Sequence, residues 1–153
     1  MEPIYARRFI ASAESFSKNE MLAKTENAEV IHQEMLRDIC KYLGTRFIEL
    51  FESTSIDLMI DWNGMRIYEI KSATLENIIA QCAKGSFQLA YYLEALTEKF
   101  RIADFALIVH KIDNDSIQEF CIQTLTRLGI KCLVYDPLHE WPNRLPGFCL
   151  NVQ

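Results

Sequence analysis

The chain has 153 residues, half of them hydrophobic and 24% charged, a composition that excludes a disordered chain and suits one globular domain. Its net charge of −5 at pH 7 argues against polyanion binding by the whole surface, although a local basic groove would suffice for nucleic acid. No apolar run is as long as a membrane span and the first residues lack the apolar segment of a signal peptide, so we expect a soluble, cytoplasmic protein without a membrane partner.

The cysteines support the same compartment. There are five of them, an odd number at wide spacings, and no pair follows a C-x-x-C pattern. This pattern disfavours a disulfide framework and a zinc or iron–sulfur site, and it favours buried free thiols.

The first part of the chain predicts one helix followed by three strands. Apolar residues at four-residue spacing indicate a helix over residues 25–44, and a short β-prone run indicates a strand over 46–51. Two further apolar runs, 56–62 and 65–71, flank Asn63-Gly64, a dipeptide typical of a tight hairpin turn.

The second part alternates helices with strands. Residues 76–100 predict one helix, or two helices broken near Gly85. A strand over 104–112, a helix over 115–129 and a last strand over 130–136 follow. Such strand–helix–strand units build parallel sheet, whereas the earlier hairpin is antiparallel.

The order α-β-β-β-α-β-α-β predicts a single α/β domain whose mixed β-sheet carries helices on both faces. We expect its core to span about residues 25–136, preceded by an N-terminal extension, 1–24, to which we assign no function. The tail, residues 137–153, holds three of the four prolines and is expected to be mostly irregular.

Three charged residues, Asp57, Glu69 and Lys71, lie within the apolar hairpin, and we call them the charged trio. Burying an ionised carboxylate is costly unless it is paired or holds a metal. The alternative is that the trio consists of strand-end charges that reach solvent, where a Glu–Lys pair contributes only about 0–1 kcal/mol.

The turn decides whether the charged trio gathers on one face. With a two-residue loop, Asp57 would lie opposite Ile70 and face away from the other two charges. With a three-residue loop, Trp62-Asn63-Gly64, in which the glycine is left-handed, Asp57 lies opposite Glu69. We expect the three-residue loop, which sends a set of apolar residues to the opposite face. These are Ile56, Leu58, Ile60, Tyr68 and Ile70.

The trio forms a hard-oxygen site with a lysine beside it. The carboxylates of Asp57 and Glu69 and the carbonyl of Ile70 are ligands that suit Mg²⁺ or Mn²⁺. Lys71 can orient or deprotonate a water molecule, or stabilise charge on a phosphate. Together these groups predict metal-assisted hydrolysis of a phosphodiester.

The pattern Asp57-x11-Glu69-x-Lys71 resembles the PD-(D/E)xK signature of the restriction-endonuclease-like nuclease superfamily, with Ile56 in place of the usual proline. The α-β-β-β-α-β order resembles the core of that superfamily. "KGSFQLAYY" resembles the Q-x-x-x-Y motif of its RecB-like branch. The resemblance covers residues 25–136, and it implies a deoxyribonuclease that uses Mg²⁺ (or Mn²⁺).

The resemblance also implies roles for individual residues. Asp57 and Glu69 would be the metal ligands, with the Ile70 carbonyl, and Lys71 would be the catalytic lysine. The first helix would add an acid, and we favour Glu34 over Glu29 because the strand ends should meet the middle of that helix. Glu34 could equally sit on a solvated face. His32 would be a further metal-site residue, and its alternative is a surface or capping histidine.

Another set of residues lies four apart on one face of the helix at 76–100. By the resemblance, Gln88 and Tyr92 are catalytic residues that help to hold the lysine, a metal-bound water or the DNA backbone. Lys84 would contact a phosphate, with Gln88 also facing the nucleic acid. The alternative is a mixed helix face with Tyr92 half-buried. We expect the adjacent Tyr91 to point into the core.

DNA is the expected partner and RNA the alternative, because no exposed-aromatic pattern typical of RNA binding appears. Sequence specificity would come from loops, from the N-terminal extension, from a homodimer or from a larger complex, since no separate DNA-reading domain is evident. Two other readings remain open. One is a non-catalytic restriction-endonuclease-like subunit that binds DNA or assembles with a partner, and the other is an unrelated α/β binding domain.

Overall fold

The computed structural model describes residues 23–44, 49–51 and 56–148, and predictions for residues 1–22, for the start of the first strand and for 149–153 lie outside this range. The described chain contains three helices and five strands in the predicted order. These elements are α2 (Ala23–Gly44), β1 (Glu49–Phe51), β2 (Leu58–Asp61), β3 (Met65–Lys71), α3 (Ile78–Leu96), β4 (Ile102–His110), α4 (Asp115–Arg127) and β5 (Lys131–Tyr135).

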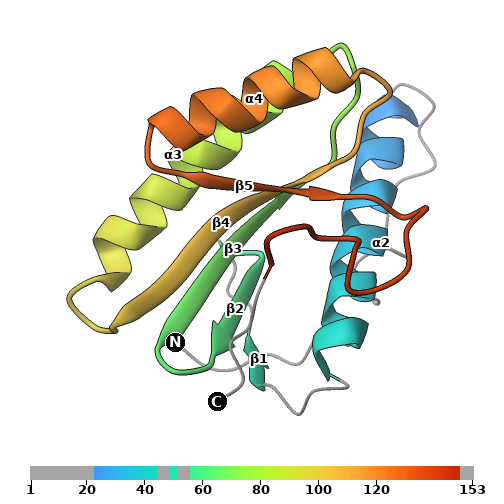
Figure 1. Ribbon diagram of the computed structural model, residues 1–153. Helices are drawn as coiled ribbons and strands as arrows, with labels where there is room; N and C mark the ends of the chain where they lie inside the picture. The colour runs from blue at the N-terminus through green and yellow to red at the C-terminus, as the bar shows by residue number, and fades with distance from the viewer. Residues whose placement is uncertain (1–22, 45–48, 52–55, 149–153) are drawn as a thin grey trace.

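The strands form one mixed sheet in the order β1-β2-β3-β4-β5 (Figure 1). β2 pairs antiparallel with both β1 and β3, whereas β3, β4 and β5 are parallel to one another. The carboxyl ends of the three parallel strands therefore lie at the same edge of the sheet as the beginning of β2. In open α/β sheets this is the edge where ligands commonly bind.

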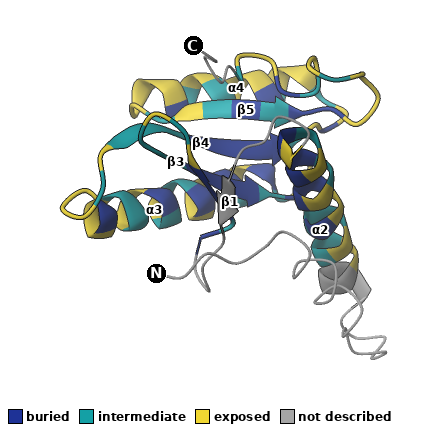
Figure 2. Cartoon of the chain, turned by 90° about the horizontal axis from the view of Figure 1, so that it is seen from below, coloured by how far each residue is buried: buried dark blue, intermediate teal, exposed yellow. Residues whose placement is uncertain are grey.

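Helices cover both faces of the sheet, as predicted (Figures 1 and 2). On one face, α2 packs against residues of β2, β3, β4 and β5. On the other face, α3 and α4 pack against the side chains that alternate with those residues, so that Leu58 and Met59 belong to opposite clusters. The α2 residues in the cluster on the α2 face are Met35, Leu36, Ile39, Cys40 and Leu43.

No helix in the described part of the chain is long and apolar enough to cross a membrane.

The cysteines of the described chain behave as apolar residues. Cys82 and Cys121 are buried free cysteines in the cluster under α3 and α4, and Cys132 is partly buried against the same cluster. Cys149 lies outside the described residues. The expectation of buried thiols is therefore confirmed for Cys82 and Cys121.

The hairpin between β2 and β3 has the predicted three-residue turn. Asp61 pairs with Met65 and Leu58 pairs with Tyr68, so the next position along the register sets Asp57 opposite Glu69. Within the turn, Asn63 and Gly64 have positive φ angles of 50° and 106°. A Cβ atom at Gly64 would also lie 2.9 Å from the Ala103 Cβ atom, so the turn needs glycine for space as well as for conformation.

One apolar residue of the hairpin faces the side opposite to the one predicted. Ile56 packs with Met59, Ile67 and Leu89 on the α3 face, not with Leu58 on the α2 face. The chain bends at Asp57, before β2 begins, and the bend breaks the alternation of faces that the prediction carried back through the strand.

Gly85 does not break α3, which runs without interruption from Ile78 to Leu96. The glycine instead allows a close approach between the helix and the sheet. A Cβ atom at position 85 would lie 2.6 Å from the Leu107 Cδ1 atom and 3.1 Å from the Lys71 Cγ atom. Both neighbours lie on the face of the sheet that α3 covers, so the helix can sit at this depth only because position 85 has no side chain.

We therefore expect Gly85→Ala to destabilise the protein by about 1–2 kcal/mol, because an overpacking cost at the upper end of about 1–3 kcal/mol exceeds the roughly 1 kcal/mol that alanine gains over glycine within a helix. Urea unfolding followed by circular dichroism measures the difference. Gly44→Ala is the matched control, since a Cβ atom there would meet nothing within 4 Å. A Gly85→Ala variant as stable as Gly44→Ala would contradict this packing.

Candidate functional site

A polar cavity of about 390 Å³ opens at the edge of the sheet where β3 ends and β2 begins. Its walls come from α2, from the two strand ends and from the first half of α3. The residues that line it are Ala28, Glu29, His32, Asp57, Glu69, Lys71, Ser72, Gln81, Lys84 and Gln88. The whole charged trio thus faces one cavity.

Asp57 is held from two sides. The backbone N–H of Ile70 donates a hydrogen bond to its Oδ2 atom at 2.9 Å, and the His32 Nε2 atom lies 3.3 Å from Oδ1. Burial opposes ionisation of this carboxyl, but the His32 interaction and the Ile70 amide outweigh it, so the pKa of Asp57 lies below its usual value. The same pairing outweighs burial at His32, whose pKa is raised. Asp57 is therefore ionised at neutral pH.

Glu69 is in the opposite situation. Its side chain is only 3% exposed, and burial, followed by the negative charge of Asp57, raises its pKa to about 9. Lys71 partly offsets this, because its Nζ atom lies 3.4 Å from the Glu69 Oε1 atom. Without a ligand, Asp57 and Glu69 are therefore not readily ionised at the same time.

Buried polar atoms without partners gather at this cavity. In the described part of the chain four buried side-chain atoms have no hydrogen-bond partner, and three of them belong to residues that line it: His32 Nδ1, Glu69 Oε2 and Gln88 Oε1. When Glu69 is protonated, it can share its proton with Asp57, but when it is ionised its Oε2 atom has no donor. Because native proteins satisfy nearly all buried polar groups, such a concentration indicates a place for a ligand.

The first helix contributes Glu29 to the cavity, whereas Glu34 is exposed and is not among the lining residues. Glu29, and not Glu34 as we predicted, is therefore the acid that this helix places at the cavity. The strand ends meet the N-terminal half of α2 and not its middle. His32 lies one turn after Glu29 on the same face, as expected of a site residue, while Glu34 points to another side of the helix.

On α3, Lys84 and Gln88 line the cavity as predicted, with Lys84 exposed. Tyr92 is not a lining residue; it packs half-buried against the apolar cluster around Ile56 and Met59. Burial raises its pKa, and the charges of Glu69 and Asp57 contribute. Tyr91 is 67% exposed, so the prediction that it lies in the core is wrong.

Sequence reasoning missed three residues of this region. Ser72 and Gln81 line the cavity, and Gly85 gives Lys71 the space for its aliphatic stem. Gln81 lies one turn before Lys84 and two turns before Gln88, so its spacing along the helix could have identified it as a residue of the same face. Ser72 and Gly85 carry no such signal, because only the packing of α3 on the sheet reveals what they do.

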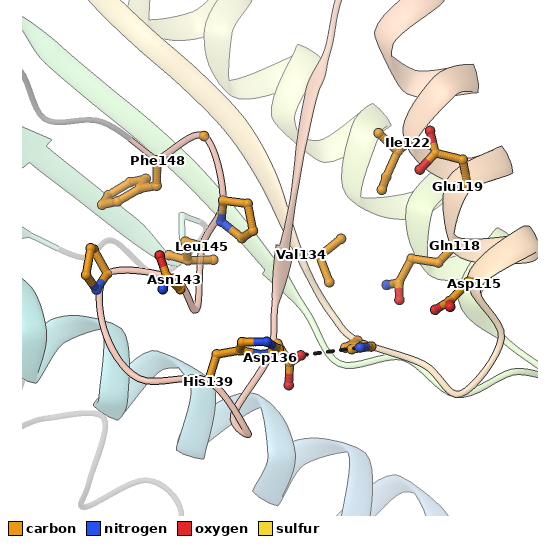
Figure 3. Close-up of a pocket in the computed structure, with 14 residues that line it drawn as sticks. Asp115, Gln118, Glu119, Ile122, Val134, Asp136, His139, Asn143, Leu145 and Phe148 are labelled. Carbon is orange, nitrogen blue, oxygen red and sulfur yellow. Dashed lines mark hydrogen bonds and ion pairs between the residues drawn. The ribbon is translucent and has the colours of Figure 1, made fainter.

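A second cavity, of about 750 Å³, lies between α4, β5 and the segment after β5. Figure 3 shows His139 beside Asp136, with Asp115 and Glu119 of α4 across the cavity. Asp136 accepts hydrogen bonds from the Leu138 N–H, from the His139 Nδ1 atom and from the Lys111 Nζ atom. These groups satisfy one another and tie the last segment to the strand ends, so we assign them a structural role.

The described residues contain no cluster of three or more His, Cys, Asp or Glu side chains arranged to hold a metal ion. The cavity that the charged trio faces is lined by Glu29 as well as by Asp57 and Glu69, and a Mg²⁺ site built on the latter two would be completed by backbone oxygen and water. The chain has no significant match among protein-family models, curated proteins or solved structures.

The raised pKa of Glu69 predicts a gain in stability when its charge is removed. We expect Glu69→Gln to raise the free energy of unfolding at pH 7.5, in EDTA, by roughly 1–2 kcal/mol, because glutamine fills the same space without an ionisable group. Chemical denaturation of wild type and variant measures the gain. Glu98→Gln, at an exposed position, is the matched control.

The increase in the free energy of unfolding caused by Glu69→Gln should also depend on pH. The pKa of Glu69 is higher in the folded protein than in the unfolded chain, so between 4.5 and about 9 the folded state binds a proton that the unfolded state releases. The stability of the wild type therefore falls as the pH rises through this window, and Glu69→Gln lacks that contribution. A gain that shrinks with rising pH would contradict the assignment.

Proposed function

We propose that the chain is a divalent-metal-dependent deoxyribonuclease with a restriction-endonuclease-like core. The observation that carries this proposal is the convergence of Asp57, Glu69 and Lys71 in one cavity, where the buried Glu69 carboxyl lacks a donor for one of its oxygens. The element order around them, α2 to β4, agrees with the α-β-β-β-α-β order of that core.

The oxygen atoms of the cavity suit Mg²⁺ or Mn²⁺. Asp57 and Glu69 would hold the ion, and the carbonyl of Ile70 would complete the protein ligands. In a strand the N–H and C=O of one residue point to the same side. Since the Ile70 N–H points to Asp57, its carbonyl faces the same side, beyond the point where β2 pairs with β3. A bound cation would supply charge stabilisation at the phosphate and a more acidic water molecule.

A cation would also resolve the electrostatic conflict of the site. Glu69 resists ionisation because it is buried beside the ionised Asp57, and Lys71 offsets this only in part. A divalent ion between two carboxylates favours the charged form of both. The unfavourable charge arrangement of the free protein thus has a use once the ion is bound.

Lys71 would stabilise the phosphodiester during hydrolysis. Its side chain is 13% exposed, and its stem passes over Gly85, so α3 limits the positions that the ammonium group can take. From there the ammonium group can donate hydrogen bonds to a phosphate oxygen or to the attacking water. Its pairing with Glu69 orients it toward the carboxylates while leaving other donors for the substrate.

DNA would approach from the exposed side of the cavity, where Lys84 lies. A phosphate contact by Lys84 contributes affinity without reading sequence. Gln88 would add a hydrogen bond through the side-chain oxygen that has no partner in the free protein, for example from a water molecule on the phosphate. Because the whole chain is acidic, binding would depend on such local contacts.

A specific observation also supports a non-catalytic relative of the same fold as a second candidate. His32 pairs with Asp57, and Lys71 pairs with Glu69, so each carboxyl already has a basic neighbour. In a subunit that only binds DNA or assembles with a partner, these pairs would be structural. The two candidates differ in whether removal of Lys71 changes a chemical rate.

The test is cleavage of circular plasmid, linear single-stranded DNA and RNA by the purified protein in Mg²⁺, in Mn²⁺ and in EDTA. We expect metal-dependent cleavage of DNA that falls by roughly 10²–10³-fold in Lys71→Ala, the range found when one transition-state donor is removed. Asp57→Asn should abolish it. Lys99→Ala and Asp61→Asn, at exposed positions, are the matched controls and should cleave like the wild type.

Each other outcome has a defined meaning. Cleavage that persists in Lys71→Ala and Asp57→Asn would contradict the site. Cleavage of RNA alone would replace the substrate class. A folded protein that cleaves nothing but binds DNA equally well with and without Lys71 would favour the non-catalytic candidate.

A further inference from the structure

An apolar groove of about 420 Å³ lies between α3 and α4, on their outer side. None of the residues that line it is charged. They are Ile79, Cys82, Ala83, Ser86, Phe87, Ala90, Phe120, Cys121, Thr124, Leu125, Leu128 and Ile130.

Large apolar side chains project from the rim of this groove. Phe87 is 77% exposed, Leu128 68%, Ile79 58% and Phe120 55%, and Tyr91, one turn after Phe87, is 67% exposed. We call these five residues the α3–α4 patch. Both helices carry exposed residues beside buried ones in Figure 2. Single exposed apolar residues are ordinary, but a contiguous patch of aromatic and aliphatic side chains marks a contact surface.

We propose that the α3–α4 patch is the interface of a symmetric dimer of this chain. A two-fold interface uses the same surface on both copies, so it must be complementary to itself. This patch contains both a projecting side chain, Phe87, and a hollow beside it between the helices. About a two-fold axis, Phe87 of each copy fills the groove of the other, and α3 and α4 of both copies form one helical layer between two sheets.

The absence of charged residues from the lining of the groove favours a second copy of the chain over other occupants. Nucleic acid and charged peptides need basic or acidic partners, and the groove offers none. Two copies with a net charge of −5 each repel one another over most of their surface. The uncharged groove is where they approach at least electrostatic cost, and interface centres are depleted of charge and rich in aromatic residues.

The size of the patch is also sufficient. Aromatic side chains bury about 150–250 Å² each, so five large side chains that are more than half exposed offer on the order of 500–600 Å² per copy. The two copies together would bury roughly 1,000–1,200 Å² of apolar surface, close to the lower limit for a specific interface before its polar rim is counted.

The interface would leave the carboxylate site open. The groove and the cavity share no lining residue, although α3 contributes to both. Gln81, Lys84 and Gln88 lie on one side of α3, and Ile79 and Phe87 lie on another. The dimer is therefore independent of the proposed nuclease activity and can be tested without it.

Sedimentation equilibrium of the full chain from about 1 to about 200 µM tests this assembly through mass action. The wild type should approach twice the chain mass at the upper end. Phe87→Glu and Phe120→Glu, one on each helix, should each weaken association by at least about 100-fold, because an interface centre tolerates no buried unpaired charge.

Leu138→Glu is the matched control. Leu138 is 90% exposed and lies outside the patch, so this variant adds the same charge at another apolar surface position and should remain dimeric. Circular dichroism shows whether each variant is folded. A wild type that is monomeric throughout the range overturns the proposal. So does a folded Phe87→Glu variant that associates as strongly as Leu138→Glu.

Discussion

The three-residue turn between β2 and β3 is the constraint on which the site depends. Side chains alternate along a strand, so a loop one residue shorter would have turned Asp57 to the α2 face, away from Glu69 and Lys71. The positive φ angles of Asn63 and Gly64 and the crowding at Gly64 hold the turn at its length. The N–H of Ile70 then fixes Asp57 just before β2 begins. The site thus follows from a turn that lies at the opposite end of the hairpin.

This arrangement works against the stability of the free protein. An apolar side chain at position 69 would pack without any cost of ionisation, whereas Glu69 is buried beside an ionised carboxylate. Strain and unfavourable electrostatics of this kind are commonly found at functional sites, where binding of a ligand offsets them.

α3 contributes both to the site and to the outer surface of the protein. It packs Leu89 on the sheet, presents Lys84 and Gln88 to the cavity, and presents Phe87 to the solvent side.

Local patterns predicted the parts of the structure that local interactions determine. The order of elements, the mixed sheet and the position of the hairpin follow from hydrophobic spacing and from the dipeptide Asn63-Gly64. The three-residue length of the turn, and with it the register, follows from the requirement that Asp57 share one face with Glu69 and Lys71. The bend at Asp57, which redirects Ile56, depends on how the chain enters the sheet and leaves no mark on the sequence pattern. The choice between Glu29 and Glu34 depends on where α2 crosses the strand ends. The role of Gly85 depends on the depth at which α3 packs. Each of these is a tertiary relation that spacing within one element does not contain.

If Asp57 and Glu69 form a divalent-cation site, the protein binds Mn²⁺ in the absence of nucleic acid, and electron paramagnetic resonance of added Mn²⁺ measures that binding. We expect the wild type and Asp61→Asn to bind Mn²⁺, and Asp57→Asn and Glu69→Gln to bind it at least about tenfold more weakly, as expected when a ligand is removed. Equal binding by all four proteins would show that the two carboxylates hold no cation, and so would a wild type that binds no Mn²⁺.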